Sequence, residues 1–474
     1  MQFIGRNNEI NALNQWLLNP SISKLTAVYG RRRIGKTRLI EEASKNNRFI
    51  KFEGLEGENQ KNQIKHAFHT LYQYSGKREH KLFQSDNWID FFILLSDFLE
   101  KKPTIVLFDE FQWMACEKTS LVSRLKYAWD NYFLKNNHVH LILCGSVSSF
   151  IVKKVINSKA LYGRIDLVLH LQAMSLKELG KAFMHKRSIY EQLEYYLAVG
   201  GIPKYFELFN ASHSTQLNLQ RLCFSKDAFF FNELQRLFVS HFGKSPHYQE
   251  VVHNLADKNF ISRLPLINKT SLSQGGSTTR IMDELELADF IESYGPIGNE
   301  NARILKRYRL LDYFLRFYYS FIFPLRKQIN SSILPIHQAL PEQKYAIWKG
   351  LSFEHFCRQN EKTIASILGF KAVRYEVGSW YQRKDLKKGA QIDLLFKRAD
   401  NVITLCEVKN KKSIDSQIIS QVEKKVEVLL NSPLNKGKHF TIEKVLISVH
   451  PPPPAIYNLG FFSKIISLEE LIEF

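Results

Sequence analysis

The stretch GRRRIGKT at residues 30–37 fits the pattern GxxxxGKT. It follows an apolar run, LTAVYG at 25–30, and leads into an amphipathic stretch, TRLIEEASK at 37–45. A strand, a glycine-containing loop and a helix in this order are typical of a phosphate-binding loop, whose backbone N–H groups surround a polyphosphate at a helix N-terminus. The stretch therefore predicts a nucleotide site in an α/β fold.

Four residues of this loop have distinct expected roles. Gly30 and Gly35 allow the backbone to wrap around the phosphates. Lys36 is expected to reach the β- and γ-phosphates, and Thr37 is expected to bind Mg²⁺ through its hydroxyl. These residues leave open whether the nucleotide is ATP or GTP.

Two later runs supply acidic and polar groups that hydrolysis needs. TIVLFDE at 104–110 is an apolar strand that ends in two carboxylates; Asp109 would hold Mg²⁺ and Glu110 would polarise the attacking water. HLILCGS at 140–146 is a second buried strand, and Ser146 at its end would contact the γ-phosphate or the water. The alternative for Ser146 is a helix N-cap.

The sequence patterns divide the chain of 474 residues into three regions, a number that fits its length. Residues 1–210 alternate apolar runs with amphipathic stretches, which predicts a parallel sheet covered by helices on both faces. Residues 211–344 are mostly helical in pattern, and residues 345–474 return to a mixture of helices and strands.

The middle region predicts a winged helix-turn-helix. Helical stretches at 247–257, 271–274 and 278–291 precede two runs, at 290–297 and 305–312, that can pair as a hairpin. The alternative interpretation is a helical lid.

The last region contains a second set of chemically active side chains. Its predicted order is a helix, three strands, a second helix and a further strand. Asp393 lies in the second strand, and the third strand ends at Glu407 and Lys409. Neighbouring strands would bring the two carboxylates together as a site for Mg²⁺ or Mn²⁺, where Lys409 could orient water and Glu354 could add a further group. This set predicts metal-assisted phosphodiester hydrolysis.

Composition bears on partners and location. The formal net charge is +20, which favours a polyanionic partner such as DNA over a basic surface without a partner. The five cysteines show no disulfide or metal spacing. The apolar run 313–325 is too short for a bilayer and contains Arg316, so no membrane span is expected. Without a signal core at the N-terminus, the expected location is the cytoplasm.

Further motifs in residues 1–210 support a family resemblance. In chain order they are FIGRNNEI (3–10), LFDEFQWM (107–114), CGSVSSF (144–150), LYGRIDL (161–167) and GGIPKYF (200–206). Together with the phosphate-binding loop, they resemble the archaeal and bacterial ATPase family of the AAA+/STAND group. The resemblance implies that the nucleotide is ATP.

The same resemblance implies roles for residues outside the loop. Gly5 and Arg6 would lie on the adenine-ribose side, and Pro203 would pack on the base. Arg164 would be an arginine finger or sensor for the γ-phosphate, acting in cis or, in a homo-oligomer, in trans. A structural salt bridge is the alternative for Arg164.

The C-terminal region resembles the PD-(D/E)xK nuclease fold in its element order and in Asp393, Glu407 and Lys409. It also resembles the domain that commonly accompanies this ATPase family. The resemblance implies a DNA nuclease, or a DNA-binding domain that does not cut. Basic residues near the site would contact DNA phosphates: Arg383, Lys384, Lys387, Lys388, Lys397, Arg398, Lys411 and Lys412.

Taken together, these features predict an ATPase coupled to winged-helix DNA binding and a magnesium-dependent deoxyribonuclease. The alternative is a STAND-type nucleotide-controlled switch whose C-terminal domain binds DNA or protein without cleavage. A third possibility is a partner that is only protein, with the positive charge incidental.

Overall fold

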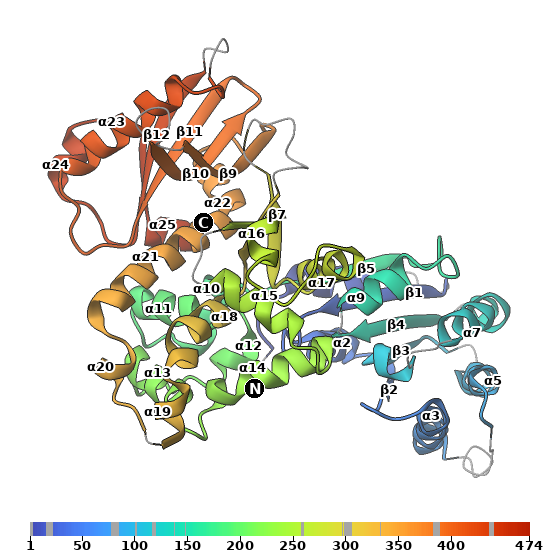
Figure 1. Cartoon of the computed structure of the whole chain (residues 1–474). Coiled ribbons are helices and arrows are strands. Elements are labelled where there is room, and N and C mark those ends of the chain that lie inside the picture. The colour runs from blue at the N-terminus through green and yellow to red at the C-terminus, as the bar shows by residue number, and fades with distance from the viewer. Residues whose placement is uncertain are drawn as a thin grey trace.

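The computed structural model describes residues 3–15, 22–76, 85–99, 102–115, 120–136, 138–146, 148–256, 260–295, 297, 306–331, 333–382, 389–435 and 440–474. These residues form an N-terminal α/β region, a central helical region and a C-terminal α/β region, which stands above the other two in Figure 1.

A five-stranded parallel sheet organises the N-terminal region, with the strand order β2-β3-β4-β1-β5. Every residue of β3 and β4 is buried, which explains why both read as continuous apolar runs. The parallel sheet predicted from the sequence is confirmed. Its strands are β1 (Lys24–Gly30), β2 (Arg48–Glu53), β3 (Thr104–Asp109), β4 (Val139–Gly145) and β5 (Leu167–Leu171).

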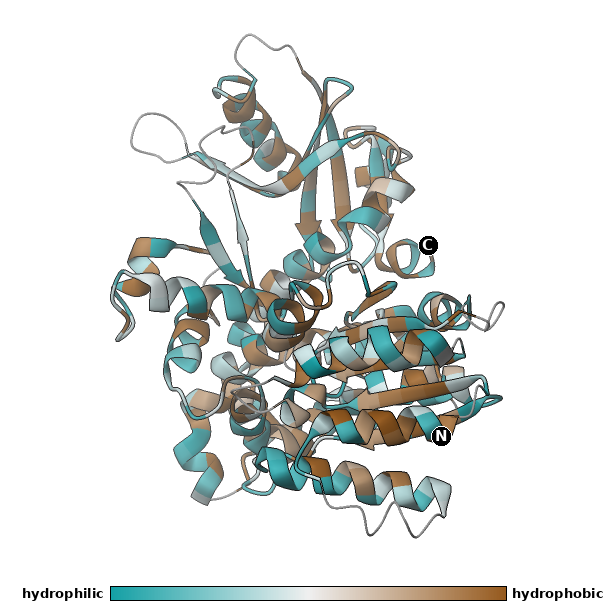
Figure 2. Ribbon diagram, turned by 90° about the vertical axis from the view of Figure 1, so that its right-hand side faces the viewer, coloured by the Kyte–Doolittle hydropathy of each residue, from teal (hydrophilic) through white to brown (hydrophobic). Residues whose placement is uncertain are grey.

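Helices cover both faces of this sheet, and hydrophobic residues concentrate in the strands between them (Figure 2). One face carries an aromatic core in which the rings of Phe52 and Phe91 meet edge to face at 5.1 Å. The core on the other face continues into the rest of the chain. The helices are α1 (Asn7–Asn14), α2 (Lys36–Ser44), α3 (Gln60–Ser75), α5 (Trp88–Leu99), α6 (Phe111–Met114), α7 (Leu121–Ala128), η2 (Trp129–Phe133), α8 (Leu134–Asn136), α9 (Ser148–Phe150), η3 (Ile151–Ile156), α10 (Leu176–Phe183), α11 (Ile189–Val199) and α12 (Pro203–Phe206).

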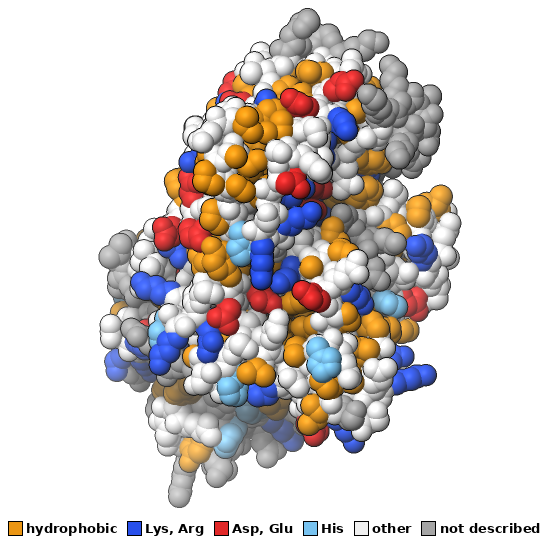
Figure 3. All heavy atoms as spheres, turned by 90° about the vertical axis from the view of Figure 1, so that its left-hand side faces the viewer, with side chains coloured by type: hydrophobic (Ala, Val, Ile, Leu, Met, Phe, Trp, Pro, Cys, Tyr) orange, Lys and Arg blue, Asp and Glu red, His pale blue; other side chains and the backbone are white. Residues whose placement is uncertain are grey.

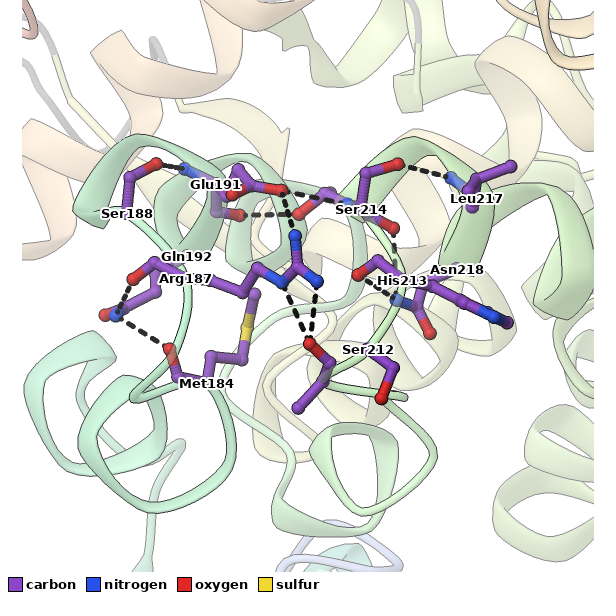
Figure 4. Close-up of polar contacts among 12 residues, drawn as sticks. Met184, Arg187, Ser188, Glu191, Gln192, Ser212, His213, Ser214, Leu217 and Asn218 are labelled. Atoms are coloured by element: carbon purple, nitrogen blue, oxygen red, sulfur yellow. Dashed lines mark hydrogen bonds and ion pairs between the residues drawn. The ribbon is translucent and has the colours of Figure 1, made fainter.

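Polar contacts fix the connection between the N-terminal and central regions (Figure 4). Arg187 donates from Nε and Nη2 to the carbonyl oxygen of Ala211, at 3.1 and 2.7 Å. The amide of Asn218 donates to the carbonyl oxygens of His213 and Ser214, both at 3.1 Å. The predicted boundary at residue 210 therefore lies in a turn that is bonded to its neighbouring helices.

In its described residues, the central region places five helices before a hairpin, and two of them match the helices predicted at 247–257 and 278–291. A three-stranded antiparallel sheet has the order β6-β8-β7. The prediction of a helix at 271–274 is wrong, because this segment forms an irregular turn. The N–H and the hydroxyl of Ser271 both donate to Glu250 Oε2, at 2.8 and 2.7 Å, and hold the turn in place. The elements are α13 (Thr215–Cys223), α14 (Phe229–Phe242), α15 (His247–Ala256), β6 (Ile261–Ser262), α16 (Arg263–Ile267), α17 (Gly276–Leu287), β7 (Ile291–Tyr294) and β8 (Arg307–Leu310).

A buried aromatic helical segment joins the central and C-terminal regions. The ring of Trp348 lies 5.3 Å from that of Phe317 and 5.5 Å from that of Phe321. Trp348 belongs to α21, which contains the predicted boundary between residues 344 and 345. No helix in the described ranges is long and apolar enough to cross a membrane. The elements are α18 (Tyr313–Phe317), η4 (Tyr318–Ile322), η5 (Phe323–Leu325), α19 (Arg326–Ser331), α20 (Ile336–Ala339) and α21 (Glu342–Gln359).

The C-terminal region is a second five-stranded sheet, in the order β13-β12-β11-β10-β9. Strands β9 to β11 are antiparallel neighbours, whereas β11, β12 and β13 run parallel. The helix, three strands, helix and strand of the predicted order are all present; β13 and the helices after β12 were missed. The elements are α22 (Glu361–Ile367), β9 (Tyr375–Gln382), β10 (Ala390–Arg398), β11 (Val402–Lys409), α23 (Gln417–Leu430), β12 (Thr441–Ser448), α24 (Pro454–Asn458), β13 (Lys464–Ser467) and α25 (Leu468–Glu473).

Candidate functional site

The loop between β1 and α2 has the backbone of a phosphate cradle. Gly30, Arg33 and Gly35 have positive φ values of 151°, 68° and 92°. A Cβ atom on Gly30 would lie 2.4 Å from the carbonyl oxygen of Leu171, so only glycine fits at this position. The loop therefore curls tightly before it enters the N-terminus of α2, where backbone N–H groups attract anions.

Two side chains at the start of α2 point to polar partners. The Lys36 ammonium donates to the carbonyl oxygens of Gly30 and Arg31, both at 3.0 Å. The Thr37 hydroxyl donates to Asp109 Oδ2 at 2.8 Å. The end of β3 and the start of α2 thus bring together a hydroxyl and a carboxylate, the oxygen donors that Mg²⁺ prefers, beside a lysine for phosphate. This donor set fits a magnesium-bound triphosphate.

Lys51 is a further basic group at this site, and its role was not predicted from the sequence. Its Nζ lies 3.3 Å from Asp109 Oδ2 and 3.4 Å from Glu53 Oε2. Burial disfavours its charge, but the two carboxylates outweigh burial and raise the pKa of Lys51. The position follows from the pairing of β2 with β3, which the sequence does not specify by itself.

The structure brings Glu110 and Ser146 into direct contact. Glu110 has a left-handed backbone, with φ 47°, which turns its side chain away from β3. The Ser146 hydroxyl donates to Glu110 Oε2 at 2.8 Å, and the amide nitrogen of Gln112 donates to the same oxygen at 2.5 Å. The hydroxyl thus donates to a carboxylate, whereas a helix N-cap would accept from a backbone N–H. The carboxylate is held in one orientation at the carboxyl end of the sheet.

The residues expected on the adenine side lie around one small apolar hollow. Arg6 and Pro203 line it together with Gly35, from the phosphate-binding loop. Arg6 is oriented by a hydrogen bond from Nη2 to the carbonyl oxygen of Gln172, at 2.6 Å. Gly5 precedes Arg6 with φ 62°, a conformation that favours glycine. An adenine ring would find apolar walls at this position.

Arg164 lies away from this cluster, which corrects the expectation that it senses the γ-phosphate in cis. It forms a bidentate ion pair with Asp130, with N···O distances of 2.7 and 2.9 Å. Two residues later, Asp166 accepts a hydrogen bond from the N–H of Leu25, at the start of β1. The phosphate-binding loop follows the carboxyl end of β1. Arg164 therefore lies near the amino end of the strands, opposite the loop. The structural salt bridge is the arrangement observed.

Replacing Arg164 by Ala is expected to leave ATP hydrolysis by isolated chains unchanged. The partly exposed ion pair with Asp130 is expected to contribute at most about 1 kcal/mol to stability. Steady-state phosphate release and a urea unfolding curve would measure the two effects. A loss of activity that appears only at high protein concentration would instead indicate action in trans.

Two arginines of the phosphate-binding loop contact the central region. Arg31 pairs with Asp312, the N-cap residue of α18, and Arg33 pairs with Glu233 of α14. Glu233 also accepts from the Tyr205 hydroxyl at 3.0 Å. Both carboxylates are buried, and burial lowers the pKa of Arg31 even though Tyr205 and Glu233 oppose this effect. The nucleotide loop is thereby tied to two helices outside the N-terminal sheet.

The C-terminal carboxylates gather around a cavity of about 660 Å³ lined by Glu354, Asp393 and Lys425. Glu407 lies buried, and its two oxygens pair with Lys409 at 2.6 Å and Lys425 at 2.7 Å. Burial raises the pKa of Glu407, but the two lysines outweigh burial and lower it. Burial and the charge of Asp393 raise the pKa of Glu354 to about 7.

A β-bulge helps to place Asp393. The pairing of β10 with β9 shifts register between Ile392 and Leu395. Such a bulge turns one side chain out of the regular alternation, so Asp393 is partly accessible between buried neighbours. The bulge and the second lysine, Lys425, were not predicted.

The carboxylates fit a metal only in part. Among the described residues, no group of three or more His, Cys, Asp and Glu side chains could hold a metal ion. Asp393 accepts a hydrogen bond from Gln391 at 2.8 Å, and Glu407 is engaged by lysines. The paired carboxylates provide hard oxygen donors, so a Mg²⁺ ion held by Asp393 and Glu407 would take its remaining ligands from water and substrate.

The basic residues expected around this site separate into groups. Lys397 pairs with Glu376 at 3.6 Å, and Arg398 pairs with Asp400 and Glu443 at 2.5 and 2.9 Å. Figure 3 shows basic side chains interspersed with acidic ones over another face of the molecule. Lys411 and Lys412 are exposed, whereas Arg383, Lys384, Lys387 and Lys388 lie outside the described residues.

Comparison with known proteins agrees with the geometry of the N-terminal region. Residues 3–209 match a protein family described as an ATPase domain predominantly from Archaea. The N-terminal region is therefore a P-loop ATPase domain of this kind.

Similarity also extends beyond the ATPase domain. The uncharacterized protein MJECL04 of Methanocaldococcus jannaschii is 28% identical over 424 residues, which are 88% of this chain and 89% of that protein. The Walker-type ATPase of Pyrococcus abyssi is 18% identical, over 67% of this chain and 96% of that chain, with a TM-score of 0.49. The ORC2 protein of Aeropyrum pernix is 14% identical, over 75% and 96%, with a TM-score of 0.44.

Proposed function

We propose that the chain hydrolyses ATP, acts on DNA and cuts it with a magnesium-dependent nuclease site in the C-terminal region. The observation that carries this proposal is the presence, on one chain of net charge +20, of two groups of residues whose chemistry suits phosphate reactions. At the first, Thr37 contacts Asp109. At the second, Lys409 lies 2.6 Å from Glu407.

In the ATPase site, each residue has a distinct task. Thr37 and Asp109 would hold Mg²⁺, which neutralises charge on the β- and γ-phosphates. Lys36 would exchange its two carbonyl partners for phosphate oxygens. Glu110 would accept a proton from the attacking water, and the hydrogen bond from Ser146 would keep the carboxylate aimed at that water.

In the nuclease site, Asp393 and Glu407 would hold Mg²⁺, which supplies an activated water and neutralises phosphate charge. Lys409 would donate to the phosphate oxygen on which negative charge increases. Lys425 balances the second oxygen of Glu407, and Glu354, with its raised pKa, can carry a proton near neutral pH.

The central region would supply a winged helix for DNA binding. α15, α16 and α17 precede the β7–β8 hairpin, which has the position of a wing. Arg280, on α17, is 73% exposed and so accessible to a phosphate or a base. We place the protein in the cytoplasm, which the buried free thiols of Cys144, Cys223, Cys357 and Cys406 support.

The proposal is tested by ATPase and nuclease assays on the purified chain, with and without DNA. Lys36→Ala is expected to reduce ATP hydrolysis at least about 100-fold, because a group that holds the transferring phosphate is lost. Asp393→Ala and Lys409→Ala are expected to abolish magnesium-dependent cleavage, while Lys371→Ala, at an exposed lysine that does not line the cavity, keeps it. Equal cleavage by all of these proteins would remove the nuclease proposal.

A second candidate function is a nucleotide-controlled switch that binds DNA or protein without cutting. The ion pairs of Arg31 and Arg33 with helices of the central region favour this function. A change in the conformation of the loop would alter these ion pairs and so shift the helices. Slow turnover with retained nucleotide would support the switch, and fast DNA-stimulated turnover would count against it. A homo-oligomer would be needed for Arg164 to act on a neighbouring chain.

A further inference from the structure

A groove of about 880 Å³ lies between the ATPase domain and α17. Its walls come from α6 and α7, which follow Asp109 and Glu110, and from η3 and α17. α17 lies next to α9 (Figure 1). An ion pair at 3.4 Å between Lys153 of η3 and Glu284 of α17 connects the two walls. The groove is therefore shared by the ATPase domain and the central region.

The lining of the groove combines cations with aromatic rings. Lys153, Lys154 and Arg280 are exposed, and Trp113 and Phe150 are partly exposed. Basic side chains that follow a phosphate backbone, next to aromatic rings on which bases stack, are the combination that binds single-stranded nucleic acid. Bases in a duplex are paired and stacked on one another, so these rings would have no free base to contact.

Two acids line the groove, Glu58 and Glu284. Glu58 is exposed and accepts from the side-chain amide of Asn62 at 2.6 Å. Glu284 is largely buried, and its carboxylate accepts from the Tyr248 hydroxyl at 2.5 Å and from Arg280 Nε at 3.0 Å. Together with Lys153, these partners lower the pKa of Glu284 despite its burial and balance its charge. Three cations in the lining (Lys153, Lys154 and Arg280) therefore outnumber the two acids and leave one positive charge in excess.

The groove also reaches the residues that would hydrolyse ATP. Gln112 lines it, and the same side chain donates to Glu110 at 2.5 Å and to Ser146 at 3.3 Å. The Gln112 amide oxygen is buried and has no hydrogen-bond partner among the described residues. A ligand that moves Gln112 would therefore change the orientation of the Glu110 carboxylate.

We propose that this groove binds single-stranded DNA, with phosphates along Lys153, Lys154 and Arg280 and bases against Trp113 and Phe150. Gln112 is a positioning residue that reports occupancy of the groove to Glu110. This inference rests on the proposed action on DNA and names the form of DNA and the surface that receives it.

The test measures binding of a fluorescein-labelled oligothymidylate by anisotropy, together with ATP hydrolysis. The double variant Lys153→Ala/Lys154→Ala and the single variant Trp113→Ala are each expected to weaken binding about tenfold. The double variant is expected to keep its basal ATPase rate. Lys181→Ala/Lys186→Ala removes the same charge from an exposed surface outside the groove and is expected to bind as the unaltered chain does.

A second measurement tests the link to hydrolysis. Gln112→Leu is expected to keep oligothymidylate affinity but to lose the stimulation of ATP hydrolysis by DNA. Binding that is equal in the groove variants and the control, or stronger for duplex DNA, would overturn the inference while leaving action on DNA intact. Stronger binding of RNA than of DNA would count against the proposed function as well. If the unaltered chain bound no DNA at all, the proposed function itself would fall.

Discussion

Replacing Glu110 by Gln is expected to lower the turnover of ATP by about 100- to 1000-fold while nucleotide affinity stays nearly unchanged. Gln keeps the size of the side chain and can still bond to Ser146, but it cannot accept the proton of the attacking water. Thr37, Lys36 and Asp109 remain in place to hold the nucleotide. Phosphate release measures turnover, and calorimetric titration with a non-hydrolysable ATP analogue measures affinity.

A matched control is available nearby. Glu56 is exposed on the loop after β2, and Glu56→Gln removes the same charge without touching Ser146 or Gln112. It is expected to turn over ATP at the normal rate. If Glu110→Gln instead lost affinity and turnover together, Glu110 would be needed for the shape of the site, and its role as a base would have to be abandoned.

Replacing Asp312 by Asn is expected to lower the free energy of unfolding by about 3 kcal/mol. Asn can still cap α18, because the N–H of Leu315 donates to Oδ1 of this residue at 2.6 Å. The substitution removes only the negative charge opposite Arg31. This residue is 8% exposed, and its guanidinium carbon lies 5.2 Å from the ring centroid of Phe290. A buried cation without its partner is costly, so the loss should be large.

A double-mutant cycle separates this charge effect from other changes. Arg31→Met removes the cation, so Arg31→Met/Asp312→Asn is expected to be more stable than Asp312→Asn alone. Urea unfolding followed by tryptophan fluorescence gives the free energies. If the loss of unfolding free energy in the double variant equalled the sum of the losses in the two single variants, the pair would not interact. The coupling between the loop and the central region would then lose its support.

The parts of the ATPase site that the sequence predicts are local in the chain. The turn at Gly30 and Gly35 and the position of Lys36 follow from a few consecutive residues. Asp109 and Glu110 follow one apolar strand, and the parallel topology brings its carboxyl end to the loop. Short-range patterns, and the rule that parallel strands share one carboxyl edge, were therefore sufficient to predict these residues.

The contacts that were not predicted join residues far apart in the chain. Glu233 and Asp312 lie about 200 and 280 positions after the arginines they bind, and nothing in the run of three arginines indicates such partners. For Arg164 the sequence left a finger in cis, a finger in trans and a salt bridge open, because family motifs specify the order of residues but not at which end of the strands a residue lies. Ser271 shows a further cause, since a serine that bonds to a distant glutamate ends a pattern that reads as helical.

One hydrophobic cluster contains Val28 of β1, Phe317 of α18 and Ile447 of β12, so the same buried surface passes through all three regions. Cleavage of the chain at residue 210 would expose a hydrophobic surface on each fragment. The separated fragments are expected to aggregate unless they are expressed together. Replacing one region by an unrelated domain would expose the same hydrophobic surface, because the cluster is shared by all three regions.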